Sequence, residues 1–373
     1  MNRQLNPFVY DDPVPPNQLV DREGETEQLL ALAEGGHNTR LQAPRRYGKT
    51  SLLGKVREEA QKIGMHTVYV DFYRALTLAE VSRRIEEAYL AALAGAPRRA
   101  VTAVTRRWRG KLVVTPGGVG AEIEPAKVRE QQRLSDLLDL PRRVFERSGM
   151  RTLVVFDEFQ DLLRIDSDVD GLLRAKIQFH RDEASYIFAG SEPGMLNGLF
   201  GDRKRPLFDQ ARPVALEPLH DEDLIEFIGA HFERSNRDPG EALDSLLDLA
   251  RGHPQRAMLL AHHLWEQTGR GTTADFESFD RAMATLDRET KEAFGQLWED
   301  LSEKPNQRKV LAALANSDET LYNRRTLDAY GLEKGSADRA VGALIDRGEV
   351  QRTDPGFLIV DPLLERWLQR TQR

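Results

Sequence analysis

The sequence contains no cysteine, which excludes disulfide bonds, thiolate nucleophiles and cysteine-ligated zinc. It also lacks long hydrophobic runs, since no apolar stretch approaches the roughly 20 residues that a membrane-spanning helix requires. The first residues, MNRQLNPFVYDDPVPPNQ, include no apolar segment of the kind that marks a signal peptide. These absences predict a cytoplasmic protein with no membrane partner.

An excess of basic charge is also missing. The chain has 53 Lys and Arg residues against 60 Asp and Glu residues, a formal net charge of -7. This balance argues against a generally basic nucleic-acid-binding surface, so any contact with DNA must be local. Hydrophobic residues at 40% and charged residues at 30% are typical of a soluble globular protein. A length of 373 residues predicts two or three domains.

Short apolar runs alternate with helical patterns through the first part of the chain. This alternation is typical of a parallel sheet covered by helices, whose ligands bind at the carboxyl ends of the strands. The strand candidates are residues 39–43, 66–72, 151–157, 185–190 and 212–218. The sequence therefore predicts an α/β fold.

Changes in the pattern divide the chain into three predicted domains. Residues 1–217 form the α/β core, with an insertion at about residues 95–125 that contains a β-hairpin turning at Gly117-Gly118. Residues 218–301 are predicted to be helical. Residues 302–373 contain three short helices, two short strands around a turn and a closing helix. Three helices followed by a hairpin are the winged variant of the helix-turn-helix.

The stretch APRRYGKT, residues 43–50, nearly matches a phosphate-binding loop (P-loop) between a strand and a helix. Gly48 lets the backbone approach a phosphate, Lys49 reaches the β- and γ-phosphates, and the Thr50 hydroxyl ligates magnesium. Alanine replaces the first glycine of the pattern, which ordinary φ values tolerate. The predicted nucleotide-binding residues are Ala43, Pro44, Arg45, Arg46, Tyr47, Gly48, Lys49, Thr50 and Ser51. Arg45 and Arg46 are expected to point to solvent or to a neighbouring subunit.

Two further strand ends carry polar residues suited to phosphate chemistry. In RTLVVFDEFQDL, Asp157 is placed to support magnesium together with Thr50, and Glu158 to polarise the attacking water. The alternative for this pair is a solvated acidic turn. Ser191 follows a buried run and is a candidate γ-phosphate sensor, although turn chemistry alone would also explain it. No Asn-Lys-x-Asp motif occurs, so ATP is favoured over GTP.

With these motifs, the chain resembles the archaeal-type ATPase family, a branch of the AAA+/STAND P-loop ATPases. The resemblance rests on NPF at Asn6, LVDRE at 19–23, APRRYGKTSLL, VVFDEFQDL, PLFDQAR, GHP at 252–254 and DPLLERWL at 361–368. It implies a P-loop ATPase core, a helical lid domain and a C-terminal winged helix. In relatives the segment around residue 21 lies near the adenine and carries glycine, where this chain has Asp21.

The resemblance also implies roles for residues outside the P-loop. Pro254 is expected near the base or ribose, and Arg256 where related proteins keep a γ-phosphate-sensing arginine. The alternative for Arg256 is a position on the solvent face of its helix. Family members that oligomerise often complete the site with a neighbour's arginine, and Arg212 is the best match for that role. A homo-oligomer is thus one expected partner state.

DNA is the other expected partner, through the winged helix. Its predicted recognition helix carries Lys334, Arg339 and Arg347 interleaved with Asp338 and Asp346. Winged helices also bind proteins, and the residues from Pro305 onward carry 11 basic against 10 acidic groups, a difference of +1. The basic run at 98–111 could bind phosphates, or form a solvated arm or subunit contact.

Two functions follow. The first is an ATPase with catalytic residues Lys49, Glu158, Ser191 and Arg212, in which magnesium-dependent hydrolysis drives movement of the lid and winged helix. The second is a nucleotide-gated switch or scaffold with little turnover.

Overall fold

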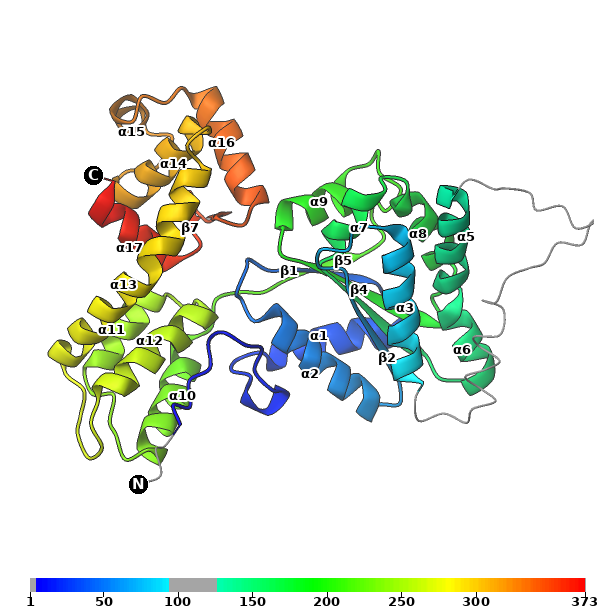
Figure 1. Cartoon of the computed structure of the whole chain (residues 1–373), viewed down its shortest axis with the longest axis horizontal. Helices are drawn as coiled ribbons and strands as arrows, with labels where there is room; N and C mark the ends of the chain where they lie inside the picture. Colours follow the sequence, from blue (N-terminus) through cyan, green and yellow to red (C-terminus); the bar gives the residue numbers. More distant parts are fainter. Residues whose placement is uncertain (1–4, 94–125, 373) are drawn as a thin grey trace, which may run out of the picture.

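The structure is a computed structural model that describes residues 5–93 and 126–372. The predicted insertion at 95–125, with its hairpin, and the basic run at 98–111 lie outside the described residues. Within the two described ranges, no helix is both long enough and apolar enough to span a bilayer. Figure 1 shows two lobes: an α/β lobe from the first part of the chain and a helical lobe that ends in the winged helix.

A five-stranded parallel sheet forms the centre of the α/β lobe, with strand order β2-β3-β4-β1-β5. All five predicted strands are present, and only β5 is markedly shorter than its apolar run suggested. The strands are β1 (Thr39–Gln42), β2 (His66–Asp71), β3 (Thr152–Asp157), β4 (Ala184–Gly190) and β5 (Arg212–Ala215). This order places the end of β1 beside the end of β4, with β3 next to β4.

Both faces of the sheet are covered by helices (Figure 1). The side chains of β3 alternate between these two faces. Leu153 and Val155 pack toward one face, and Val154 and Phe156 pack toward the other. The first face is covered by α1 (Glu23–Glu34) and α2 (Lys49–Lys62). The second is covered by α3 (Leu78–Ala92), α5 (Ala126–Leu138), α6 (Leu140–Ser148), α7 (Phe159–Ile165), α8 (Val169–Ile177) and α9 (Pro193–Gly201). Burial on both sides explains why β3 and β4 read as nearly continuous apolar runs.

The helical lobe contains the lid and the winged helix. The lid consists of α10 (Asp221–Arg234), α11 (Ala242–Ala250), α12 (Pro254–Gln267) and α13 (Phe276–Asp300). The winged helix follows with α14 (Pro305–Asn316), α15 (Arg324–Ala329), α16 (Lys334–Asp346), the antiparallel pair β6 (Val350–Arg352) and β7 (Phe357–Ile359), and α17 (Pro362–Thr371). The predicted order of three helices, hairpin and closing helix is therefore present.

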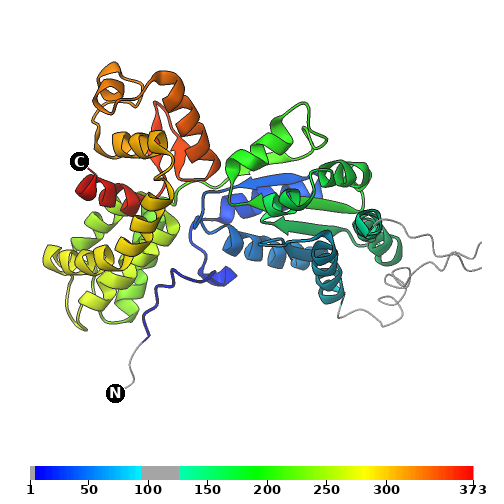
Figure 2. The ribbon, with the colours of Figure 1, turned by 45° about the horizontal axis from the view of Figure 1, so that its top comes forward.

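One continuous hydrophobic core joins the lid to the winged helix, although the sequence suggested two separate units. Phe294 on α13 lies 6.2 Å from Trp367 on α17, measured between ring centroids. Phe8, which was expected in the α/β core, also belongs to this cluster and packs 5.6 Å from Phe232 of α10. The N-terminal strap, residues 6–14, therefore runs from the helical lobe to the α/β lobe (Figures 1 and 2).

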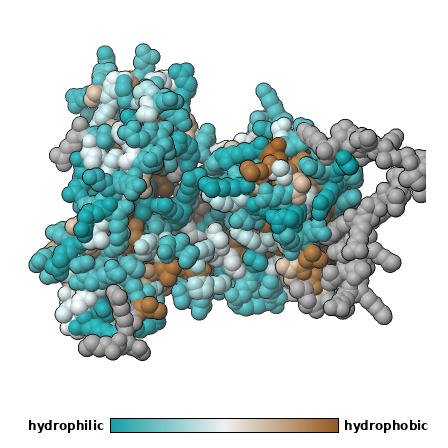
Figure 3. Space-filling view, in the orientation of Figure 1, coloured by the Kyte–Doolittle hydropathy of each residue, from teal (hydrophilic) through white to brown (hydrophobic). Residues whose placement is uncertain are grey.

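The winged helix also touches the α/β lobe. Helix α16 packs against α9, and a Cβ atom on Gly194 would lie 2.8 Å from the Cα atom of Asp346. The two helices thus meet at a position where glycine provides the clearance. The face of the molecule in Figure 3 is mostly hydrophilic, with hydrophobic residues gathered in a few patches.

Candidate functional site

The loop between β1 and α2 has the backbone of a phosphate-binding loop. Gly48 has a φ of +79° and open space around it, so the left-handed backbone conformation itself calls for glycine. Arg46 also has a positive φ, of 67°. Ala43 is buried and is absent from the positive-φ residues, so alanine fits here without strain. Helix α2 begins at Lys49, and its first N–H groups are available to an anion.

Lys49 lies between the two acidic residues that end β3. Its Nζ atom is 2.8 Å from Asp157 Oδ1 and 2.7 Å from Glu158 Oε1. The lysine is buried apart from 8% of its surface, so its charge is balanced by these carboxylates in the ligand-free chain. The solvated acidic turn considered as an alternative is therefore wrong for Asp157, which is only 3% exposed.

Glu158 is the most highly coordinated side chain of the site. It follows β3 with a φ of 49°, caps α7, and accepts a hydrogen bond of 2.8 Å from Ser191 Oγ at its Oε2 atom. Gln160 Nε2 donates to the same oxygen. Burial raises the pKa of Glu158, but the charge and hydrogen bond of Lys49, with those of Gln160 and Ser191, lower it further, so the net pKa lies below its ordinary value.

Asp157 is fixed from the opposite side by Tyr69 on β2, whose hydroxyl donates to Asp157 Oδ2 at 2.8 Å. Burial and the neighbouring Asp157 carboxylate raise the pKa of Tyr69, so the phenol remains a donor. Thr50 is exposed at the start of α2. A hydroxyl and a carboxylate are hard oxygen donors, which fits magnesium better than any softer metal.

A cavity of about 500 Å³ opens beside these residues. One end is polar and contains Lys49, Thr50, Glu158 and Ser191. The other end is lined by apolar side chains from the strap, the segment before α1 and the lid, namely Val14, Leu19, Val20, Leu219, Phe227 and Met258. A polar end beside a phosphate-binding loop and an apolar end match a molecule with phosphates and a flat base.

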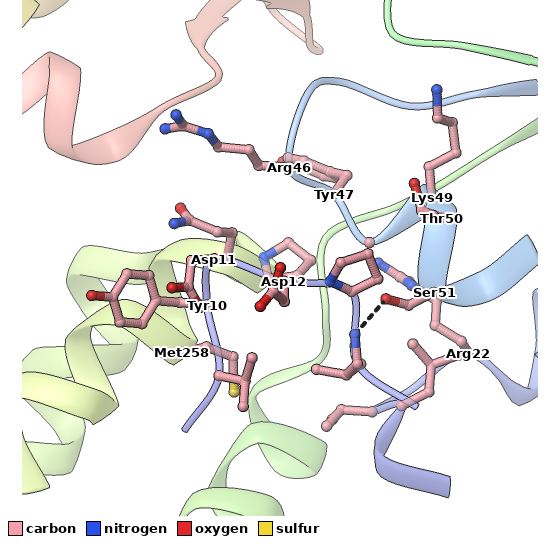
Figure 4. A pocket seen from close by; sticks show the side chains of 18 of the residues that line it. Tyr10, Asp11, Asp12, Arg22, Arg46, Tyr47, Lys49, Thr50, Ser51 and Met258 are labelled. Carbon is pink, nitrogen blue, oxygen red and sulfur yellow. Dashed lines mark hydrogen bonds between the residues drawn. The ribbon is translucent and has the colours of Figure 1, made fainter. Parts of the chain in front are cut away.

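The N-terminal strap closes one side of this cavity. Val14 N–H donates to Ser51 Oγ at 3.1 Å, which fastens the strap to α2 (Figure 4). Tyr10 lies against α12, 5.0 Å from His262 between ring centroids, and Asp11 and Asp12 line the space between these anchors. The strap therefore connects the phosphate-binding loop to the lid.

Helix α12 meets the cavity through Pro254, the position at which the family resemblance placed a base or ribose contact. His253 lies behind it and is 2% exposed, with its ring 4.9 Å from that of Tyr47 in the P-loop. Its side chain accepts the N–H of Arg256 and caps α12. Burial lowers the pKa of His253 to about 4, so the ring is neutral at neutral pH.

We expect this buried histidine to make the fold acid-sensitive. Because its pKa is lower in the folded chain than in the unfolded chain, stability is lost as the pH falls from 6.5 toward about 4. His253→Asn keeps a capping acceptor but cannot titrate, so its free energy of unfolding in urea should fall less between pH 7 and pH 5 than that of the unmodified protein. An equal fall would contradict this explanation.

Arg256 does not face the cavity. It lies on another side of α12, is 3% exposed, and forms a bidentate ion pair with Asp361 at the start of α17, with 2.9 Å from Nε to Oδ1. The alternative of a solvent-facing arginine is therefore wrong. In this conformation its charge joins the lid to the winged helix.

The remaining predicted arginines differ in their relation to the cavity. Arg45 and Arg46 line it as part of the P-loop, whereas Arg212 does not. Both P-loop arginines are exposed, as the sequence suggested, but Arg46 points toward the winged helix of its own chain (Figure 4), where its charge interacts with Glu349 and Asp361. Arg212 begins β5 and pairs with Thr39 at the beginning of β1, four residues before the P-loop. It therefore lies at the amino ends of the strands, whereas the site of its own chain lies at their carboxyl ends.

Three contributors to the site were not anticipated. Gln160 and Tyr69 bind the two acidic residues of β3, and the strap residue Val14 binds Ser51. The NPF motif was the only signal for the strap. Asp21 has a φ of 48°, a conformation that glycine adopts freely and that aspartate tolerates, so aspartate fits where the family resemblance implied glycine.

Comparison with known families and structures gives clear matches. A family described as an ATPase domain predominantly from Archaea matches residues 19–259, and a probable winged helix domain matches residues 292–370. A Walker-type ATPase of Pyrococcus abyssi has a similar fold, with a TM-score of 0.70 and 19% identity over 97% of this chain and 99% of that one. The ORC2 protein of Aeropyrum pernix aligns over 98% of both chains at 17% identity, with a TM-score of 0.49. No curated protein matches the sequence.

Proposed function

The chain belongs to the family of ATPase domains found predominantly in Archaea, and from this premise we propose that it binds ATP with magnesium and hydrolyses it to move the lid and winged helix. The observation that carries the proposal is the cluster of Lys49, Glu158 and Ser191 at the polar end of a cavity whose other end is apolar. These groups supply a cation for phosphates, a base for water and a hydroxyl donor.

The residues divide the work of hydrolysis among them. The N–H groups at the start of α2 and the Lys49 ammonium bind the phosphates. Thr50 and Asp157 would hold the magnesium ion, which would neutralise phosphate charge when bound. Glu158 orients the attacking water and accepts its proton, and a pKa below the ordinary range keeps the carboxylate ionised for this role.

Movement of the helical lobe follows from three contacts around the cavity. The strap joins Ser51 to the lid, Tyr47 touches His253 at the start of α12, and α9, which begins two residues after Ser191, packs against α16. A nucleotide that changes any of these contacts biases the position of the winged helix.

DNA is the proposed partner of the winged helix, and a second copy of the chain is the proposed source of an arginine for the site. The observation that favours DNA is a group of exposed basic side chains on α15 and α16: Arg324 and Arg325, which are 94% and 88% exposed, with Lys334 and Arg339. Arg212, at the amino end of β5 and away from its own site, would act in a neighbour's site.

Replacing Lys49 tests nucleotide binding. Lys49→Met removes the cation for the phosphates and leaves Asp157 and Glu158 close together without a counter-charge, so we expect ATP affinity to fall roughly 10- to 100-fold. Titration with a fluorescent ATP analogue and magnesium measures this, with Lys62→Met, an exposed lysine at the end of the same helix, as the control. Unchanged affinity in Lys49→Met would refute the site. Binding without any turnover in the unmodified protein, alone or with DNA, would favour the nucleotide-gated switch.

A further inference from the structure

We propose that Gln160 is a positioning residue that holds one oxygen of Glu158, so that the other oxygen takes the proton of the attacking water. The proposal deepens the proposed ATPase function and rests on it. Gln160 lies on the first turn of α7, two residues after Glu158, and is 2% exposed. Its contacts are all with residues that meet at the ends of β3 and β4.

The two carboxylate oxygens of Glu158 have different partners. Oε1 lies 2.7 Å from Lys49 Nζ. Oε2 accepts from Gln160 Nε2 and from Ser191 Oγ, and Gln160 Nε2 also lies 3.5 Å from Ser191 Oγ. One oxygen is therefore held by a cation and the other by two neutral donors.

This division matters once phosphates bind. Lys49 is the cation that the phosphates attract, so its turning toward them releases Oε1, whereas Gln160 and Ser191 have no competing reason to leave Oε2. The water oxygen then forms a bond to the γ-phosphorus as the bond from that phosphorus to the β,γ-bridging oxygen breaks. The electron pair of the broken bond stays on ADP, and the water proton goes to Oε1.

The space for the Gln160 amide is provided by Gly190 at the end of β4. A Cβ atom on residue 190 would lie 2.2 Å from Gln160 Oε1, closer than any real contact. A larger residue before Ser191 would therefore displace the amide from its position against Glu158. The backbone φ of Gly190 is not positive, so this glycine is explained by the close approach and not by its own conformation.

The other end of the same amide has no role in stability. Gln160 Oε1 is buried and accepts no hydrogen bond from any described residue. An unpaired buried acceptor is unfavourable, and an apolar side chain of similar length would avoid it. The contacts that favour an amide at this position are those of its N–H groups with Glu158 and Ser191.

Gln160→Met is the first test, and we expect kcat to fall roughly 10- to 100-fold with ATP affinity within about twofold of the unmodified protein. Gly190→Ala should reproduce the loss while Gln160 itself stays in the chain. Gln131→Met on α5, which removes an amide donor to Asp166 at the end of α7, is the matched control.

The same substitution in a Glu158→Gln background separates positioning from general damage. If Gln160 acts through Glu158, adding Gln160→Met to Glu158→Gln leaves the residual rate unchanged. A further loss there, or a loss of ATP affinity as large as the loss of kcat, would overturn the proposal. So would a normal kcat in Gln160→Met, and that result would leave the proposed function intact if Glu158→Gln is inactive. Normal hydrolysis by Glu158→Gln would instead refute the proposed function.

Discussion

Glu158→Gln is expected to lower kcat for ATP hydrolysis by roughly 10²- to 10⁴-fold while ATP still binds. Glutamine has nearly the same shape and can still accept the Ser191 hydroxyl, but it cannot take a proton from water. It also removes the charge that holds Lys49 in the ligand-free chain, where the two groups are 2.7 Å apart. ATP affinity should therefore be unchanged or higher.

Single-turnover phosphate release and equilibrium ATP binding measure the two effects separately. Glu192→Gln is a matched control, because Glu192 neighbours Ser191 but pairs with Arg164 instead of Lys49. Phosphate release at the normal rate from Glu158→Gln would assign the base to another residue. Loss of ATP binding would show that the substitution disturbs the P-loop.

Arg256→Met is expected to destabilise the helical lobe by about 3–5 kcal/mol, because Asp361 keeps a buried charge without its counter-ion. The side chains of Arg256 and Asp361 are 3% and 19% exposed. Burial raises the pKa of Asp361, but Arg256 lowers it more, so the net pKa lies below its ordinary value. The stability from this pair is present above the ordinary aspartate pKa and is lost as the pH falls through the lowered one.

Urea unfolding measures this loss, and two variants define its origin. Arg251→Met removes the ion pair between Arg251 and Glu365, whose side chains are 34% and 17% exposed. This substitution should lower the free energy of unfolding by about 1 kcal/mol or less. Adding Asp361→Asn to Arg256→Met removes the uncompensated charge and keeps an acceptor for Leu363 N–H, so it should recover much of the stability. Normal stability of Arg256→Met together with lost hydrolysis would instead restore the phosphate-sensing role that the family resemblance implies.

The sheet and the P-loop could be predicted because their signals are local. The central strands β3 and β4 are nearly uninterrupted apolar runs, and Gly-Lys-Thr between a strand and a helix determines both backbone and chemistry. Asp157 and Glu158 were recognisable for the same reason, because they directly follow an apolar run. The sheet order then brings the end of β3 near the end of β1.

The direction of individual side chains could not be predicted in the same way. Arg256 stands in PQRAMLL, where apolar residues surround it, so the spacing does not reveal whether the arginine faces the cavity or α17. Gln160 reads as an ordinary helix residue because its partners Gly190 and Ser191 lie 30 residues away along the chain. The strap carries no periodic pattern, and only its contacts with Ser51 and α12 reveal its position.

The continuous core that joins the lid to the winged helix has a mechanical consequence. Helices α10 to α17 share one buried apolar cluster, and the Arg256–Asp361 pair adds a charged contact across the same boundary. Sliding the lid against the winged helix would expose this apolar surface to water, which makes relative motion within the lobe costly. The lobe is thus expected to move as one rigid body: in the proposed function, a small rotation of α12 at the nucleotide would be carried through α13 and α17 and would reach α15 and α16 as a larger displacement.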